Sequence, residues 1–364
     1  MSYNSKMLSN LLTLVAALLC LSAHAADIQD EVERDFALRS IGDLEISNTR
    51  GGIVIHGWSM DKIRVKARRT MKTENAEEAK KLAAAVDFRY RELDGNIELS
   101  AEYGKGLDIQ DRLKERANPK ASMEMVVYAP ANLKLRVWAV NGAVHVKEWR
   151  APLEARTDSG PIQIEDVRAE TVSLLCPSCE MSVKNVHSSV RCMGGSGPIN
   201  LNAVNGKSIY VESNSGQQQL KRVSGEQLYV SKDGGISGSL LQGRVEFHTL
   251  SGEVSLTDGA GFLSGSTDSG NIDVKMLQWK FADKALIESV KGSIFLTLPS
   301  SFAGEVDLWS LYGHTHTGFT VAAISDNPVF GPEPANHLQG RVGQGGDQLR
   351  VNSQFGDINI SKGI

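Results

Sequence analysis

Apolar and polar residues alternate in short runs through most of this chain, and the runs repeat. The segment 157–164 shows the unit: a hydroxyl residue, a polar turn, a glycine, and then Ile162 and Ile164 separated by one polar residue. The same pattern returns at 249–256, 267–274 and 353–360. Alternation on both sides of a turn is typical of two short strands that each bury one face.

The glycine of each copy serves as its anchor. Successive anchors lie 17 to 22 residues apart, with one longer gap of 43 residues, and Cys179 replaces the glycine in one copy. A small or hydroxyl residue precedes most anchors by three positions. We expect a corner at each anchor, where the backbone needs positive φ or leaves no room for a side chain. The anchors are Gly142, Gly160, Gly197, Gly216, Gly235, Gly252, Gly270, Gly292, Gly313 and Gly356.

The fixed offsets predict which residues point inward. In the copy anchored at Gly235 they place Leu228 and Val230 in the core. A single two-stranded unit cannot bury its apolar face, so the copies must stack on one another. A sandwich or barrel does not need near-constant spacing, so the sequence predicts an all-β, single-chain β-solenoid (a β-helix) with about 18–20 residues per coil.

The chain divides into three regions. Residues 1–25 have the features of a signal peptide: an apolar run at 11–21 and a small-x-small cleavage site at 23–25. We therefore expect cleavage after Ala25, export to the periplasm or cell surface, and no transmembrane segment in the mature chain. Residues 26–130 are predicted to form a β-rich N-terminal capping region with one helix at 74–89, which Thr73 can cap. Residues 131–364 carry the solenoid repeats and a loop insertion at 318–347.

Composition and charge limit the partners. The net charge is −4, which gives no indication of nucleic-acid binding, and the 35 glycines suit a chain with many turns. One strand, at 61–69, has a basic outer face formed by Arg64, Lys66 and Arg68. This face is either solvated or a contact for an anionic partner surface.

Cys176-Pro177-Ser178-Cys179 is the sharpest local motif. Its two cysteines occupy the hydroxyl and glycine positions of one corner, and the ends of a turn lie within reach of a disulfide. A zinc site would need a second ligand pair, and a thioredoxin-like dithiol would need a βαβ context. We predict a disulfide between Cys176 and Cys179, with Cys192 buried as a free thiol.

His314 and His316 lie on one face of a predicted strand and are the candidates for a metal site. By register they point outward, and a site would need a third ligand such as His337 or Asp326 from the insertion. The sequence contains no nucleophile elbow, phosphate loop or H-E-x-x-H motif. We therefore expect no catalytic residues and no cofactor.

The order of these motifs resembles the bacterial "putative adhesin" family, a domain of unknown function related to autotransporter-adhesin head domains. The resemblance is carried by residues 44–48 running into 51–58, by the strand at 63–67, and by the segment 126–130. The serial glycine copies that end at 355–360 complete it. The resemblance implies a right-handed β-solenoid in the cell envelope, and it supplies no catalytic residues.

Three functions fit these features. The leading hypothesis is an exported, non-enzymatic envelope protein that acts as an adhesin-like binding module or scaffold, with an unknown protein or envelope glycan as partner. The second is a β-helix enzyme acting on polysaccharides, which would gather acidic and basic residues on successive coils. The third is a periplasmic envelope-stress sensor that contacts its regulatory partner through Arg64, Lys66 and Arg68.

Overall fold

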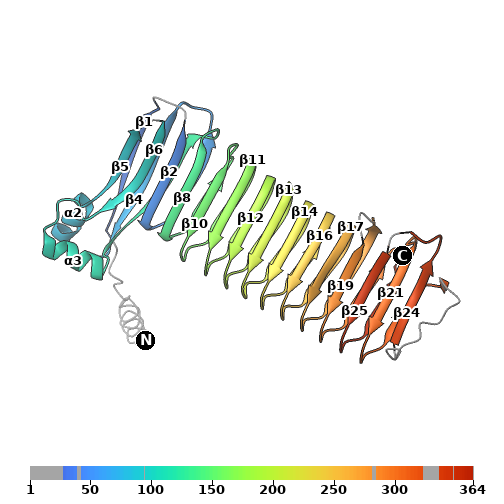
Figure 1. Cartoon of the computed structure of the whole chain (residues 1–364). Helices are drawn as coiled ribbons and strands as arrows, with labels where there is room; N and C mark the ends of the chain where they lie inside the picture. Colours follow the sequence, from blue (N-terminus) through green and yellow to red (C-terminus); the bar gives the residue numbers. More distant parts are fainter. Residues whose placement is uncertain are drawn as a thin grey trace, which may run out of the picture.

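The computed structural model describes residues 28–38, 42–93, 95–280, 284–322, 336–346 and 348–363. The predicted signal peptide, residues 1–25, lies outside these ranges. The described residues form a continuous 26-stranded sheet that winds into a rod (Figure 1). The β-solenoid predicted from the repeat is confirmed.

Each coil of the rod has two strand segments and two corners. We call the side formed by residues before each anchor glycine the first side, and the side formed by residues after it the second side. Some strands, such as β11, bend from the second side to the first. The central strands are β8 (Lys134–Asn141), β9 (Val144–Lys147), β10 (Leu153–Thr157), β11 (Ile162–Cys176), β12 (Met181–Gly194), β13 (Ile199–Ser213), β14 (Gln218–Ser231), β15 (Ile236–Ser239), β16 (Gln242–Thr249), β17 (Val254–Thr267), β18 (Ile272–Trp279), β19 (Ala285–Ser289) and β20 (Ile294–Leu298).

The core consists of stacked apolar ladders between the two sides. Val144, Ile162, Met181 and Ile199 are fully buried and pair in register on four successive coils. Burying one such side chain contributes about 1.5–3 kcal/mol, and each coil adds several. The residues that alternate with them face outward, so the rod can vary its surface while its core stays apolar.

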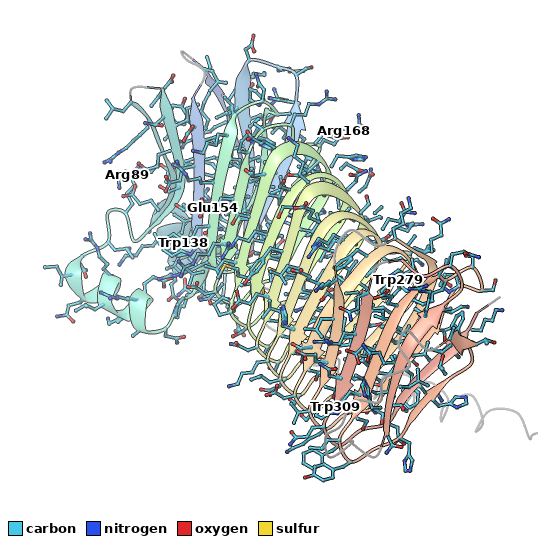
Figure 2. All side chains as sticks on the ribbon, turned by 45° about the vertical axis from the view of Figure 1, so that its right-hand side comes forward. Arg89, Trp138, Glu154, Arg168, Trp279 and Trp309 are labelled. Atoms are coloured by element: carbon cyan, nitrogen blue, oxygen red, sulfur yellow. A yellow bond between two sulfur atoms is a disulfide. The ribbon has the colours of Figure 1, made fainter. Side chains whose placement is uncertain are left out.

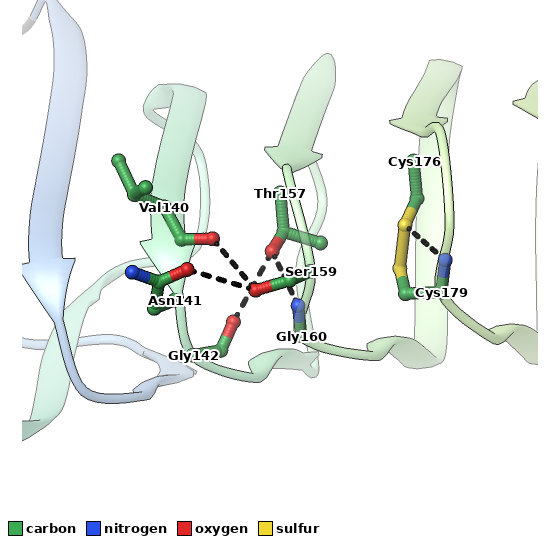
Figure 3. The surroundings of a disulfide bond; sticks show 8 residues. All are labelled: Val140, Asn141, Gly142, Thr157, Ser159, Gly160, Cys176 and Cys179. Carbon is green, nitrogen blue, oxygen red and sulfur yellow. Dashed lines mark hydrogen bonds between the residues drawn. A yellow bond between two sulfur atoms is a disulfide. The ribbon is translucent and has the colours of Figure 1, made fainter.

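The first corner is built from the hydroxyl and the glycine of each copy. Thr157 Oγ1 accepts a hydrogen bond of 3.0 Å from the backbone N–H of Gly160 (Figure 3). A Cβ atom on Gly160 would lie 2.0 Å from the carbonyl oxygen of Gly142 in the preceding coil. The anchors are not among the described glycines with positive φ, so close approach between coils excludes a side chain there.

The register in one copy differs from the prediction by one residue. The anchor that stacks between its neighbours is Gly234, not Gly235, and Ser231 fills the hydroxyl position. A slip of one residue moves every side chain to the other face of a strand. Gln227 and Tyr229 are therefore buried, whereas the predicted core residues Leu228 and Val230 face outward (intermediate exposure). The Tyr229 hydroxyl donates to Gln227 Oε1 at 2.7 Å, which satisfies both groups inside the core.

The first coil of the solenoid lies within the capping region. Strands β2 (Asp43–Arg50) and β3 (Ile53–Trp58) pair in parallel with β8 and β9. On their other edges lie β6 (Asn96–Tyr103) and β7 (Ala121–Pro130). Three further strands run antiparallel and close this end: β1 (Ile28–Ala37), β4 (Lys62–Met71) and β5 (Val86–Leu93).

Of the described residues, two segments at this end of the rod are helical (Figure 1). Helix α2 spans Ala76–Ala84 and is shorter than the predicted 74–89, because strand β5 begins at Val86. Its cap is Asn75 rather than Thr73, since Asn75 Oδ1 accepts from the backbone of Glu77 at 2.9 Å. A second helix, α3 (Ile109–Ala117), lies in a segment for which the sequence predicted no regular helix.

The other end of the rod does not follow sequence order. Strands β25 (Gln348–Ser353) and β26 (Ile358–Lys362) insert between β19–β20 and the earlier strands β21 (Gly304–Ser310) and β22 (Thr315–Thr317). Figure 1 shows β25 between β19 and β21. The outermost strands, β23 (Val321–Ala322) and β24 (Asn336–Val342), are antiparallel and come from the predicted insertion. Residues 323–335 of that insertion lie outside the described ranges.

Candidate functional site

The second corner carries a regular ladder of left-handed residues, which the sequence pattern did not predict. The residue six positions after each anchor has φ between 54° and 57° on seven successive coils. These residues are Glu148, Asp166, Asn185, Ala203, Arg222, Leu240 and Asp258. Such a conformation is unfavourable for residues other than glycine, asparagine and aspartate. The presence of Asp or Asn in three of the seven copies was the only signal in the sequence.

A buried side chain follows the left-handed residue and holds the second corner in place on six of the seven coils, whereas the seventh has Gly259 there. Trp149 is fully buried, and its indole Nε1 donates to the carbonyl oxygen of Leu133 at 3.0 Å. Val167 takes the same position on the next coil and is also fully buried. The residues on either side of these buried side chains face outward, so Glu148 and Arg150 flank Trp149 on the surface.

A cleft lies along this corner next to the capping strands. Its volume is about 780 Å³, and its lining combines Trp58 and Asp61 of the cap with Arg150, Asp166 and Arg168 of the corner. A smaller cleft of about 320 Å³ follows and shares Asp166 with it. The two form one open groove that runs along the rod.

Two columns of opposite charge line this groove. The backbone N–H of Arg168 donates to the carbonyl oxygen of Trp149 at 2.9 Å, which sets Arg168 opposite Arg150 one coil away. The backbone N–H of Glu148 donates to the carbonyl oxygen of Glu165 at 3.2 Å, which sets Glu148 opposite Asp166. One edge therefore presents two guanidinium groups, and the other edge presents two carboxylates. Figure 2 shows Arg168 projecting from the surface of the rod.

Trp58 forms the cap wall of the cleft. Its Nε1 donates to the carbonyl oxygen of Lys62 at 2.9 Å, and its ring packs against Tyr128 with centroids 5.6 Å apart. These contacts hold the indole in one orientation while part of it stays accessible. A fixed, partly exposed aromatic ring is a common component of binding sites.

The predicted basic stripe is present but paired with acids. Strands β1 and β7 both pair antiparallel with β4 and place carboxylates beside the cations. Arg64 contacts Asp35 at 2.7 Å, Lys66 contacts Glu33 at 3.4 Å, and Arg68 contacts Glu124 at 3.8 Å. Hydrogen bonds from Arg64 and then Lys62 hold the pKa of the exposed Asp35 well below its ordinary value. The stripe is therefore a mixed-charge surface, and its role as a partner contact stays a prediction.

The two candidate metal ligands lie apart from the proposed third ligand. His314 and His316 are exposed at strand β22 on the second side, and His314 Nδ1 lies 3.5 Å from Asp357. His337 lies on β24, which pairs with β21 on the first side, and contacts Asp307 at 2.8 Å. Asp326 lies outside the described residues. Within the described ranges, no group of three or more potential ligands could hold a metal ion.

The predicted disulfide joins Cys176 and Cys179, and Cys192 is a buried free cysteine. Burial raises the pKa of the Cys192 thiol to about 12. Burial likewise raises the pKa of Tyr229 and Tyr103 above the ordinary range. Cys192 and Tyr229 are fully buried in the core, Tyr103 is partly buried in the cap, and none of the three lines the groove.

Comparison with known proteins places the chain in a family without assigning a ligand. The Toastrack DUF4097 family matches residues 41–361. No curated protein matches the chain. Within the described ranges, neither helix is long and apolar enough to cross a membrane.

Several solved structures align with most of the chain at low identity. A "putative cell adhesion protein" from Clostridium sporogenes is 10% identical, with 92% of this chain and 100% of that chain covered and a TM-score of 0.20. A "putative lipid binding protein" from Parabacteroides distasonis is 12% identical, with coverage of 92% and 97% and a TM-score of 0.30. A "putative adhesin" from Bacteroides fragilis is 12% identical, with coverage of 92% and 97% and a TM-score of 0.22.

These superpositions are too poor to support an argument about function. The family match, in contrast, extends from the first coil to the last strand of the rod. It agrees with the resemblance seen in the order of the sequence motifs. The chain belongs to the Toastrack DUF4097 family.

Proposed function

We propose that this chain is an exported binding module of the cell envelope that holds its ligand in the groove along the second corner. The observation that carries the proposal is the repetition of the corner on seven successive coils. A solenoid fixes the spacing of its coils at about 4.8 Å, so outward side chains form regular columns. Such columns suit recognition of an extended ligand.

The composition of the groove also supports binding. Its lining combines a fixed indole with guanidinium, carboxylate and amide groups, which together offer both donors and acceptors. The left-handed backbone at Glu148 is strained, and strain of this kind occurs often at functional sites. Export rests on the sequence features of residues 1–25.

A polysaccharide-acting enzyme is the second candidate. The corner brings Glu148, Asp166, Arg150 and Arg168 onto adjacent coils, as such an enzyme would require. An enzyme of this class would need two carboxylates at defined separation across the scissile bond. The groove is open along the rod, and we assign its carboxylates to binding.

A binding experiment with separated envelope fractions tests the proposal. The mature chain, from Ala26, is mixed with sacculi, with outer-membrane vesicles and with soluble envelope polysaccharide, and bound protein is measured by sedimentation or filtration. We expect saturable binding to at least one fraction, without release of soluble sugar fragments. Absence of binding to all fractions would contradict the proposal, and release of fragments would favour the enzyme.

A further inference from the structure

This inference rests on the proposed function and names the ligand class. Arg150 and Arg168 lie side by side on adjacent coils. Neither forms an ion pair with a carboxylate of the described ranges. His187 pairs in register with Arg168 and continues the same column. Like charges placed opposite one another on neighbouring strands repel, so this column is unfavourable without a counter-charge.

Several arginines of the chain are paired with carboxylates. Arg64, Arg69 and Arg136 each contact a carboxylate within 3.0 Å, although all three lie on the capping side of the rod. The whole chain has a net charge of −4, so it does not attract anions in general. Arg89 of the cap also lacks an ion pair with the described residues, so the particular feature of Arg150 and Arg168 is that they lie beside each other on adjacent coils and line the same cleft.

The opposite edge of the groove supplies acceptors. Glu148 and Asp166 present carboxylates two residues before each guanidinium, and Asn185 donates its amide to Asp166. Carboxylates and amides at this spacing can accept and donate hydrogen bonds to vicinal hydroxyls. The guanidinium group of an arginine, in contrast, suits a carboxylate, which it binds through two parallel hydrogen bonds.

The groove is open at its ends and continues along the second side. Beyond the corner, a shallow depression of about 450 Å³ is lined by amides and hydroxyls, among them Asn202, Gln219, Ser237 and Thr257. Asn202 also lines the smaller corner cleft, so the two surfaces are continuous. An open groove of this length fits a polymer better than a small molecule.

We propose that the groove binds an acidic polysaccharide whose sugars carry both hydroxyl and carboxylate groups, as uronic acids do. The carboxylates of the polysaccharide contact Arg150 and Arg168. Its hydroxyls contact Glu148, Asp166 and the amides of Asn202 and Gln219. Trp58 packs against one sugar ring at the cap end of the groove. Binding neutralises these two guanidinium groups, which form no ion pair with the described residues.

The test uses a defined ligand, an oligogalacturonate of about ten sugars, with neutral dextran and double-stranded DNA as comparison polymers. Binding of the mature chain is measured by isothermal titration calorimetry at about 0.15 M salt. We expect binding to the oligogalacturonate alone. Arg150→Gln and Arg168→Gln should each weaken it about tenfold, because each removes one charge-assisted contact.

Arg89→Gln is the matched control. Arg89 lies on β5 of the cap, far from Arg168 in Figure 2, and its replacement removes the same charge. The control should bind like the natural chain, and thermal melting checks that all three variants are folded. Equal weakening by all three variants, equal binding to DNA, stronger binding to dextran, or no binding to the oligogalacturonate would each overturn the inference. If envelope fractions still bind in those cases, the proposed function survives and only the ligand class is wrong.

Discussion

The Sγ atom of Cys176 lies 2.9 Å from the backbone nitrogen of Cys179 and accepts a hydrogen bond from it. Thr157 and Gly160 make the equivalent bond through a hydroxyl on the preceding coil (Figure 3). The disulfide corner is thus a substituted form of the repeating corner, with sulfur in place of oxygen. Its position and its hydrogen bond indicate that the disulfide has a structural role.

The cysteine corner should be replaceable by the ordinary corner. In the double variant Cys176→Thr, Cys179→Gly, we expect a loss of no more than about 2 kcal/mol in the free energy of unfolding, because the disulfide closes a very short loop. Dithiothreitol should lower the melting temperature of the natural chain and leave that of the variant unchanged. A natural chain that melts at the same temperature with and without dithiothreitol would show that the disulfide does not stabilise it.

The anchor glycines should not tolerate a methyl group. Gly160→Ala places a Cβ atom 2.0 Å from the carbonyl oxygen of Gly142, and relief requires adjacent coils to move apart. We expect a loss of about 1–3 kcal/mol in urea unfolding. Gly318→Ala is the control, since its nearest neighbour would lie at 3.5 Å, and it should change stability by less than about 0.5 kcal/mol. Equal effects of the two substitutions would refute the close-approach explanation.

The left-handed ladder predicts opposite effects of one substitution at two sites. Ala203 has φ of 57°, so Ala203→Gly removes a steric penalty of about 1 kcal/mol and should leave stability unchanged or slightly raised. Ala169 lies in β11 and is not among the residues with positive φ, so Ala169→Gly should destabilise by about 0.5–1 kcal/mol. Urea denaturation of both variants measures the contrast. If the two substitutions destabilise equally, the left-handed backbone carries no strain.

The buried Cys192 thiol should make the chain less stable in alkali. Its pKa in the folded chain is about 12, against about 9 for an exposed thiol. Below pH 9 both states keep the proton, so stability does not depend on this group. As pH rises from 9 towards 12 the unfolded state alone loses the proton, and the stability falls by about 1.4 kcal/mol per pH unit.

The variant Cys192→Val separates this effect from that of the buried tyrosines. Tyr103 and Tyr229 also have raised pKa values and destabilise the fold in alkali in both proteins. The difference in unfolding free energy between variant and natural chain should shift by about 2 kcal/mol between pH 8 and pH 10.5 in favour of the variant. A difference that stays constant with pH would mean that the thiol is not desolvated.

The sequence predicted the repeat and the first corner because identical residue classes recur at fixed offsets there. The error at Gly235 arose at a pair of adjacent glycines, where either could serve as anchor. The stacking contact of Gly234 with Gly216 decides between them, and that contact is visible only in three dimensions.

Other features could not be predicted from the sequence, for different physical reasons. The second corner requires a backbone conformation and not a residue type, so residues as unlike as Arg222 and Leu240 occupy it. The pairing of Arg64 with Asp35 depends on antiparallel strands that are distant in sequence. The insertion of β25 between β19 and β21 breaks the rule that successive copies stack in order.

Hydrogen–deuterium exchange of the mature chain, with and without a bound envelope fraction, tests the central claim most directly. The backbone N–H groups of Glu148 and Arg168 hold the second corner together, and a ligand in the groove should slow their exchange. We predict protection of peptides covering 148–150 and 166–168, with unchanged exchange at Arg64–Arg68. Protection confined to the Arg64–Arg68 strand or to the first side, with none at the second corner, would contradict the account.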